Sequence, residues 1–354
     1  MSKMRVLAFL SMYPTLSQTY KENELRALLP HCELRILAGG KVDAAYHDHL
    51  PCARYTSPAD LRRVIDEFKP DIVHGHYINT TRNLAQAAEM AGVPYTVRTH
   101  SFDLIDKPPE ALRPHVPFVN RDSCIGVLAF PFLVPKLAEA GFDEAKLYES
   151  WPVVDYARFY DRSPNGPDVM NTGACLPKKN MESYIELATR VTNRRFDLYP
   201  IGYLTDQIRE HNEARGSPVH VHPMIEPDLM PAVYKRHQWL IYTANPEVPT
   251  IGWPMSIAEA QASGTGVLIQ RIRPDVEIYV GDAGYVFDTL EEAADILRQD
   301  VPEEIRERGF EHARKSDIYA HIELLLNIWR KALGREDEMT DRYLPHGERE
   351  LAHA

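Results

Sequence analysis

The sequence predicts an α/β protein with two doubly wound parallel-sheet domains. Its 354 residues suit two domains of ordinary size. Short apolar runs alternate with amphipathic helical stretches, and this alternation stops at a segment rich in Pro, Asp and Gly, residues 155–168, and then restarts. Continuous apolar strands joined by helices are typical of parallel sheets covered on both faces. We therefore expect one domain over residues 1–155, a second over 156–330 and a charged tail over 331–354.

The candidate strands are short apolar runs bounded by turn residues. Those of the first half are residues 5–10, 33–37, 71–75, 95–99, 124–129 and 146–150. Those of the second half are residues 169–173, 196–201, 219–222, 239–242, 266–270 and 284–287. A last helix, over residues 317–333, carries apolar residues at helical spacing.

Two of the helices between these strands carry clear boundary residues. Residues 57–68 begin with Ser57 as the N-cap and Pro58 at the first helical position. The stretch 80–92 closes with Gly92, because glycine is the usual residue just after a helix.

The composition is that of a globular protein with a core, since 44% of the residues are apolar and 26% are charged. No apolar run reaches the roughly 18 residues that a membrane span needs. The opening MSKMRVLAFLSMYP could pass for a signal peptide, but it lacks a small-residue cleavage site. We interpret RVLAFL as a buried first strand and expect a cytoplasmic protein.

Charge and cysteine content exclude several classes of protein. The net charge of −11 argues against a nucleic-acid partner. The four cysteines, which contain no CxxC pair, argue against a disulfide framework and against a zinc site. We expect mostly buried free thiols at Cys32, Cys52, Cys124 and Cys175.

Two doubly wound sheets whose strand carboxyl ends face each other form one central cleft, and ligands bind just beyond such ends. The first turn, SMYPTLSQTY, lacks the glycines of a dinucleotide fingerprint, so we predict no NAD site there. Its polar residues Ser11, Ser17, Gln18 and Thr19 either cap the following helix or contact a ligand.

Histidines follow the next strands. His74 and His76 alternate at a strand end and could face opposite ways. With no further ligand adjacent in sequence, buried hydrogen-bonded histidines are favoured over metal ligands. His100, Ser101 and Asp103 follow a strand directly. His100 could donate to a sugar hydroxyl or stabilise charge, whereas Asp103 could simply cap the turn.

In the second half, the segment NTGACLPKKN follows a strand and precedes a helix. Gly173 allows close approach of the backbone, and Lys178 or Lys179 lies beside a helix N-terminus. Together these features suit a diphosphate. The alternative is a solvated pair of surface lysines.

The segment NPEVPTIGWPMSIAEAQASGTGVLIQ carries two interpretations. Ser256-x-x-Glu259 fits a capping box that opens a helix, which Gly264 then ends. Alternatively, Glu259 accepts hydrogen bonds from ribose hydroxyls at the cleft. The sequence leaves both open.

Taken together, these segments resemble the retaining family-4 glycosyltransferases, over roughly residues 5–330. YPTLSQTYKENEL resembles that family's P-x-x-S-[EQ]-T-[FY] opening, and DIVHGHY and YTVRTHSFD resemble its third and fourth strand ends. WPVVDYARFY resembles its segment at the domain junction. NTGACLPKKN resembles its phosphate loop GRLxxxKG, and GWPMSIAEAQASGTGVL resembles GFGxxxxEAMACGTPVI, the most specific of these motifs.

The resemblance implies the GT-B fold, two Rossmann-like domains facing a cleft, and transfer of a sugar from a nucleotide-sugar donor with retention and without a metal or other cofactor. Glu259 would hold the donor ribose, Lys179 the diphosphate, and His100 would lie near the donor sugar. The remaining donor-binding residues would be Gly173, Lys178, Ser256 and Ile257, and the acceptor-binding residues Ser17, Gln18, Thr19, His76 and Asp103. The final helix would return to the N-terminal domain.

The chain departs from the family pattern at three positions. The arginine of the phosphate loop falls on Ala174, the first glutamate of the signature falls on Ile251, and a proline falls on Gly266. Glu247, four residues before Ile251, would replace the missing glutamate as a catalytic residue if VPTI is a small insertion. The missing positive charge could come from one of three arginines, namely Arg98, Arg271 and Arg273.

Two alternatives to a transferase stay open at this point. One is a GT-B protein with other nucleotide-sugar chemistry, such as an epimerase or phosphorylase, and the other is a catalytically silent nucleotide-sugar-binding subunit. The acceptor could be a glycan, a lipid-linked sugar or a small molecule, so peripheral membrane contact also stays open. The sequence does not specify the base, the sugar or the oligomeric state.

Overall fold

The structure is a computed structural model that describes residues 3–40, 49–202, 204–248 and 250–340. Its contacts divide the chain into two compact units. The first unit contains Met1–Val153 and Ile318–Ala354, and the second contains Val154–Asp317.

The first unit is built on a parallel seven-stranded sheet in the order β3-β2-β1-β4-β5-β6-β7. Its strands are β1 (Met4–Leu10), β2 (Cys32–Ala38), β3 (Ala53–Arg54), β4 (Ile72–His76), β5 (Tyr95–Arg98), β6 (Cys124–Ala129) and β7 (Leu147–Glu149). Its α-helices are α1 (Thr19–Leu28), α2 (Pro58–Phe68), α3 (Thr81–Ala91), α4 (Pro109–Leu112), α5 (Val116–Val119), α6 (Val134–Ala140) and α15 (Ile318–Ala332).

Helices cover both faces of this sheet, as the continuous apolar strands predict. Side chains of a strand alternate between its faces. In β1, Leu7 and Phe9 join a core with α2, α3 and α6. Val6 packs on the opposite face against α1 and α15, and Ala8 packs there against α1.

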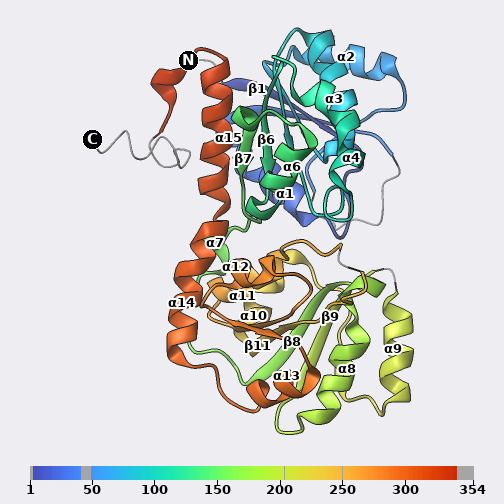
Figure 1. Cartoon of the computed structure of the whole chain (residues 1–354), viewed down its shortest axis with the longest axis vertical. Helices are drawn as coiled ribbons and strands as arrows, with labels where there is room; N and C mark the ends of the chain where they lie inside the picture. Colours follow the sequence, from blue (N-terminus) through green and yellow to red (C-terminus); the bar gives the residue numbers. More distant parts are fainter. Residues whose placement is uncertain (1–2, 41–48, 203, 249, 341–354) are drawn as a thin grey trace. The chain divides into compact units, whose positions relative to one another are not determined.

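Helix α15 closes the first unit, running alongside α1 and β6 (Figure 1). Leu325 and Trp329 are fully buried and cluster with Val6 and Leu128 of the first sheet. The implied return of the final helix to the N-terminal domain is confirmed. The division at Asp317 therefore differs from the expected domain end at residue 330, because the apolar face of α15 packs on the first sheet.

The second unit is built on a parallel six-stranded sheet in the order β10-β9-β8-β11-β12-β13. Its strands are β8 (Asp168–Ala174), β9 (Phe196–Ile201), β10 (Val219–Val221), β11 (His237–Tyr242), β12 (Gly266–Gln270) and β13 (Tyr285–Phe287). Its α-helices are α7 (Tyr156–Phe159), α8 (Met181–Arg190), α9 (Thr205–Ala214), α10 (Met230–Lys235), α11 (Met255–Ala262), α12 (Asp275–Val280), α13 (Leu290–Leu297) and α14 (Glu303–Ala313). Helices α8, α9 and α13 supply one of its cores, and α11 packs against α7, α10 and α14.

The predicted fold class of two doubly wound parallel sheets is confirmed, and each predicted strand occurs within a residue or two of its predicted ends. Ser57 caps α2 as predicted, in a capping box with Asp60, and Gly92 ends α3 in the left-handed conformation. The sequence analysis missed the short edge strand β3.

Further expectations concern the two ends of the chain, the cysteines and membrane-spanning helices. The opening RVLAFL forms the buried strand β1. All four cysteines are free, and three of them are buried. Within the described residues, no helix is long and apolar enough to cross a membrane. Of the expected tail, residues 341–354 lie outside the described residues.

The packing of α15 predicts that Leu325→Ala destabilises the protein. Leu325 is fully buried, so truncation should lower the free energy of unfolding by about 2–5 kcal/mol. The matched control is Lys331→Ala, an exposed position on the same helix, which should change it by less than about 0.5 kcal/mol. Denaturant unfolding followed by tryptophan fluorescence measures both. Equal midpoints for the two variants would contradict the assignment of α15 to this core.

Candidate functional site

In each sheet the strand order reverses between two neighbouring strands, and ligands of such sheets bind beyond the carboxyl ends of that pair. In the second unit the pair is β8 and β11, and in the first it is β1 and β4. The turns after these four strands, and the turns beside them, are therefore the places where a ligand is expected to bind.

The turn after β8 holds Lys179 beside a helix N-terminus. Gly173 makes this arrangement possible, since a Cβ added there would lie 2.2 Å from the Nζ of Lys179. Gly173 also has a φ of +128°, which other residues rarely adopt. Helix α8 follows with Asn180 at its N-cap and no side-chain cap, so its first backbone N–H groups face the same turn.

The Lys179 ammonium has no hydrogen bond or ion pair among the described residues, and it lies 5.2 Å from the centre of the Tyr242 ring. Burial, with a smaller effect of the neighbouring Lys178 charge, lowers its pKa to about 8. A half-buried cation without a carboxylate partner, next to an uncapped helix N-terminus, can bind an anion.

Hydrogen bonds join the turn after β11 to the same place. Thr243 donates its hydroxyl to the carbonyl of Lys179 (2.9 Å), and the backbone N–H of Asn245 donates to the carbonyl of Lys178 (2.9 Å). Asn245 in turn accepts from the backbone N–H of Glu247 (3.0 Å). Glu247 is exposed, and these bonds keep its loop beside the lysine turn.

Helix α11 begins at Met255 after Pro254 and has no side-chain cap. The proposed capping box of Ser256 and Glu259 is therefore wrong, because the helix starts one residue before Ser256. Glu259 instead accepts a hydrogen bond from the hydroxyl of Tyr234 through Oε2 (2.7 Å). Its Oε1 has no hydrogen-bond partner among the described residues. Burial raises the pKa of Glu259, while the Tyr234 hydrogen bond opposes that shift. The Glu259 carboxylate therefore takes no part in a helix cap.

The first turn of α11 also contains Ser256 and Ile257, the other predicted donor-binding residues of this helix. Ile257 is buried and Ser256 is half-buried. The backbone N–H groups at this helix N-terminus are a second set of uncapped donors at the carboxyl edge of the sheet.

The departures from the family pattern are buried and apolar. Ile251 is 4% exposed, and Ala174 is 6% exposed. Two of the arginines considered as substitutes have carboxylate partners in the second unit: Arg273 pairs with Asp275 at 2.8 Å, and Arg271 pairs with Asp288 at 2.9 Å. Neither replaces the missing positive charge without giving up an ion pair.

In the first unit, the turn after β1 leads into α1 without a side-chain cap. Gln18 is the N-cap residue, and its side chain instead accepts from the buried ammonium of Lys21 (2.5 Å). The capping alternative is thus wrong for Gln18. Ser17 and Thr19 flank it and are half-buried. Burial lowers the pKa of Lys21 to about 7.

The histidines of β4 meet a buried carboxylate that the sequence analysis did not single out. Glu24 of α1 is fully buried and lies 2.7 Å from His74 Nε2 and 3.3 Å from His76 Nε2. The two histidines therefore do not face opposite ways. Arg98, the third of the considered arginines, forms an ion pair with the other oxygen of Glu24. Burial alone would raise the pKa of Glu24, but Arg98 and the two histidines together outweigh it and hold that pKa well below its usual value.

His100 lies next to this group. Its Nε2 is 2.9 Å from His76 Nδ1, and the two rings are stacked. Its ring also contacts the rings of Tyr20 and Tyr77, whose hydroxyls hydrogen-bond to each other. His100 is half-buried, whereas His76 is 1% exposed.

Asp103 is buried and holds the turn that carries His100. Its carboxylate accepts from the backbone N–H groups of His100 (2.9 Å) and of Ile78. Burial raises the pKa of Asp103 to about 7. This arrangement gives Asp103 the capping role that the sequence analysis held as the alternative to ligand contact.

Among the described residues, two groups of histidine and carboxylate side chains place their ligand atoms within 4.8 Å of one another. The first is Glu24 with His74 and His76, where Arg98 already neutralises the carboxylate. The second is Asp197 with His220 and His222. Asp197 also accepts from Arg195 (2.7 Å) and faces His237 (3.3 Å). Because cationic partners surround both carboxylates, we assign no metal to either group.

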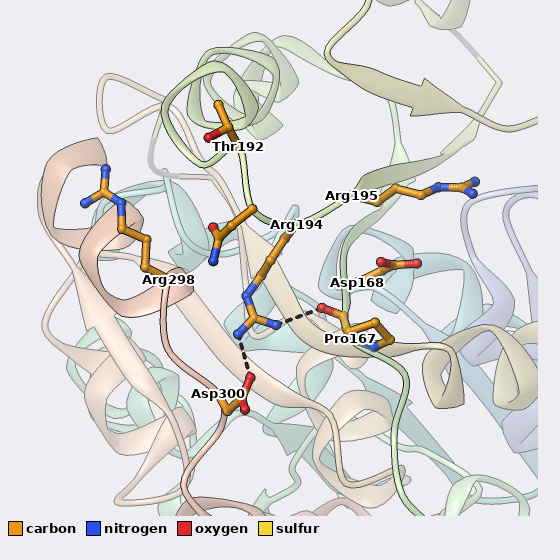
Figure 2. Close-up of a pocket in the computed structure, with 8 residues that line it drawn as sticks. Pro167, Asp168, Thr192, Arg194, Arg195, Arg298 and Asp300 are labelled. Carbon is orange, nitrogen blue, oxygen red and sulfur yellow. Dashed lines mark hydrogen bonds and ion pairs between the residues drawn. The ribbon is translucent and has the colours of Figure 1, made fainter.

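A surface pocket of about 630 Å³ lies at the opposite edge of the second sheet (Figure 2). It lies at the amino ends of β8 and β9, where Arg194 donates to the carbonyl of Pro167 and pairs with Asp300, both at 2.8 Å. Arg194 also donates to the carbonyls of Leu297 and Gln299. This arginine joins the loops at that edge, so the pocket is structural and separate from the lysine turn.

Glu24, Lys21 and Tyr234 are the residues that sequence reasoning missed at these sites. Glu24 and Lys21 lie on α1 as buried charges, and Tyr234 lies on α10. The only sequence signal was the run of polar and charged residues in an amphipathic first helix, which usually marks a solvated face. Their burial follows from the packing of α1 against the sheet.

Part of the first unit matches a known protein family. Residues 16–125 match the family model of the glycosyl transferase 4-like domain. The sequence comparison with curated proteins found no match.

Solved structures of similar fold cover nearly the whole chain. HepE from Anabaena, in complex with UDP and glucose, is 16% identical, with a TM-score of 0.66, over 95% of this chain and 100% of that one. Sucrose-phosphate synthase from Thermosynechococcus elongatus is 12% identical, with a TM-score of 0.68, over 93% and 99%. The lipopolysaccharide outer core galactosyltransferase WaaB is 12% identical, with a TM-score of 0.64, over 92% and 99%.

Two doubly wound units with open turns at their strand switch points define the GT-B class of glycosyltransferases, and the solved structures share this fold. The match of residues 16–125 to the glycosyl transferase 4-like domain, together with this fold, confirms the resemblance drawn from the motifs.

The contact between Gly173 and Lys179 predicts the result of Gly173→Ala. The new methyl group should push the ammonium out of its buried position and raise the pKa of Lys179 from about 8 toward its usual value of about 10.4. NMR titration of the lysine 13Cε signals measures this pKa, with Lys179→Arg identifying the signal.

Gly216→Ala is the matched control. Gly216 also has a positive φ, +80°, but an added Cβ would meet nothing within 4 Å. Both variants should lose about 1–2 kcal/mol of stability to backbone strain, while only Gly173→Ala should alter the Lys179 titration. An unchanged titration in Gly173→Ala would refute the contact.

Proposed function

We propose that this glycosyltransferase transfers a sugar from a nucleotide-sugar donor, with retention and without a metal, and that the donor binds at the carboxyl edge of the second sheet. The observation that carries the proposal is the unpaired Lys179 ammonium beside the uncapped N-terminus of α8. HepE, of the same fold, was solved with UDP and with glucose, which supports a nucleotide sugar as the donor class.

The proposed donor site divides into a phosphate part and a ribose part. Gly173, Lys178 and Lys179 bind the diphosphate together with the backbone N–H groups of α8. Glu259 accepts the ribose hydroxyls through its open Oε1, and Ser256 offers a backbone donor at the start of α11. Ile257, whose own N–H donates to the carbonyl of Pro254 (3.2 Å), lines this part of the site. Tyr234 orients the Glu259 carboxylate through its hydrogen bond.

Metal independence follows, in this proposal, from the charges of the phosphate part. The leaving diphosphate gains negative charge in the transition state, and a lysine with two helix N-termini can stabilise that charge in place of a divalent cation. Glu247, whose loop is hydrogen-bonded to the lysine turn, is the proposed catalytic carboxylate in place of the glutamate displaced by Ile251.

The proposed acceptor site belongs to the first unit. Its residues lie in the turns after β1, β4 and β5, and are Ser17, Gln18, Thr19, His76 and Asp103. Gln18 is bonded to Lys21, and Asp103 is bonded to the turn of His100, so these two act by shaping the turns. His100 is the proposed catalytic residue that meets a sugar hydroxyl.

A thermal-shift panel of nucleoside diphosphates and nucleotide sugars, with and without chelator, tests the donor site. A ligand at about 100 times its dissociation constant should stabilise the protein by roughly 2.7 kcal/mol. The shift should occur with one base and persist in chelator. Loss of the shift in chelator would contradict metal independence, and the absence of any shift would contradict the donor site.

The affinity for that nucleoside diphosphate should depend on pH through Lys179. Its pKa in the free protein is about 8, so the ammonium is present below pH 8 and is lost as the pH rises through that value. Affinity should therefore be constant below about pH 7 and fall by up to tenfold per pH unit above pH 8. Isothermal calorimetry across pH 6.5–9.5, about three pH units, measures this profile.

Two arginine variants control this experiment. Lys179→Arg keeps its charge over the whole range, so its affinity should no longer fall above pH 8. Lys178→Arg should keep the fall, because Lys179 is unchanged. A wild-type profile that stays flat to pH 9.5 would remove Lys179 from the site.

Turnover measurements test the carboxylates. Glu259→Gln should weaken nucleotide binding about 10- to 100-fold, the value of a hydrogen bond to a charged group. Glu247→Gln should lower kcat while the nucleotide affinity changes little. Glu210→Gln, an exposed position on α9, is the control and should match the wild type. Normal turnover in Glu247→Gln would exclude it as the catalytic carboxylate, and a wild type that binds donor without turnover would favour the silent-subunit alternative.

A further inference from the structure

A chain of buried polar contacts, made of hydrogen bonds and one charge contact between Glu24 and His76, runs through the first unit and ends at His100. It begins at Trp329 of α15, whose Nε1 donates to the hydroxyl of Thr96 (3.0 Å). The Thr96 hydroxyl lies 2.8 Å from His74 Nδ1, and His74 Nε2 lies 2.7 Å from Glu24. All of these side chains are fully buried or within 1% of it.

The direction of each hydrogen bond in this chain follows from the two groups that have a fixed role, the indole N–H of Trp329 as donor and the Glu24 carboxylate as acceptor. An indole N–H only donates, so the Thr96 hydroxyl accepts it and gives its own proton to His74 Nδ1. A carboxylate only accepts, so His74 Nε2 carries a proton and donates it to Glu24. His76 Nε2 lies 3.3 Å from the same carboxylate without making a hydrogen bond, and a proton on it is attracted by the carboxylate charge, whereas a bare lone pair would be repelled. The low pKa of Glu24, held down by Arg98, keeps it an acceptor at neutral pH.

These protons determine the tautomers of the next two rings. Burial lowers the pKa of His76 to about 4, so the ring is neutral and its second nitrogen, Nδ1, is bare. Among the described residues its hydrogen-bond partner is His100 Nε2, at 2.9 Å, so His100 Nε2 carries a proton and donates it. Burial also lowers the pKa of His100 well below its usual value, and the charges of Arg98 and Lys21 add to this effect.

His100 is then a neutral ring whose remaining nitrogen, Nδ1, has a free lone pair. Among the described residues this atom has no hydrogen-bond partner, and it is not fully buried. A lone pair repels phosphate oxygens and other acceptors, whereas it accepts a hydrogen bond from a hydroxyl.

We propose that Glu24 and His76 are positioning residues that fix the tautomer of His100 with its proton on Nε2, so that Nδ1 accepts a hydrogen bond from the sugar hydroxyl that His100 meets in the proposed function. The inference rests on the proposed function for the identity of the ligand as a sugar. It replaces the donor role considered for His100 from the sequence. Its assignment of protons rests on the geometry of the network together with the neutral state of the buried histidines.

The test compares two variants of similar size at His76. His76→Gln keeps an acceptor for His100 Nε2 and a donor for Glu24, whereas His76→Leu keeps neither. On 15N-histidine-labelled protein, NMR reports which ring nitrogen carries the proton, and the signal of His100 is the one lost in His100→Phe. In the wild type and in His76→Gln, His100 should be protonated at Nε2 alone. In His76→Leu it should become a mixture of tautomers.

Kinetics provide the second measurement. His76→Leu should lower kcat/KM about 5- to 10-fold, the effect of one weakened neutral hydrogen bond, and His76→Gln should restore it. His100→Phe should lower kcat/KM without changing the dissociation constant for the nucleoside diphosphate, because the ring meets a hydroxyl and not a phosphate.

Three results would overturn the proposal. They are a wild-type His100 protonated at Nδ1, a His100 tautomer unchanged in His76→Leu, and a loss of nucleoside diphosphate affinity in His100→Phe. If instead the protein has no transferase activity, the proposed function fails, while the NMR result still decides the tautomer and the positioning roles independently.

Discussion

The parallel order of strands is the constraint on which both candidate sites depend. In a doubly wound sheet the chain turns outward in both directions from its first strand, so β8 and β11 in one unit, and β1 and β4 in the other, leave their carboxyl ends without a crossing helix. The turns at those ends carry Lys179, Glu247, His76 and the segment before α1. Within each unit, this topology brings residues that are far apart in sequence to the same edge of one sheet.

The two units differ in whether the charged side chains of their candidate sites have partners of opposite charge. In the second unit, Lys179 has no ion-pair partner among the described residues, and α8 and α11 begin without a side-chain cap, so an anion can bind there. In the first unit, Glu24 is matched by Arg98 and two histidines in a dry interior, where an unmatched carboxylate would be very costly. The paired network holds its side chains and their protons in fixed positions, whereas the Lys179 cation is open to bind an anion.

Helix α15 joins the end of the chain to this network. Its apolar face completes the core beneath the first sheet, and its Trp329 starts the hydrogen-bond chain that ends at His100. The last helix therefore has two functions in the first unit. It stabilises the sheet by burial, and through Thr96 and His74 it helps to fix the orientation of side chains beneath the candidate catalytic turn.

The sequence by itself determined the two parallel sheets, the ends of most strands, the caps at Ser57 and Gly92, and the lysine turn after Gly173, because hydrophobic period and turn chemistry are local properties. Only the packed structure shows that Glu24 is buried between His74 and His76 and that Ser256 is no cap. The return of α15 to the first sheet was implied by the family resemblance and not by a local pattern. A charged residue on an amphipathic helix is ordinarily solvated. Whether it is instead buried and paired depends on residues 50 to 300 positions away, on the order of the whole chain length, which no local pattern encodes.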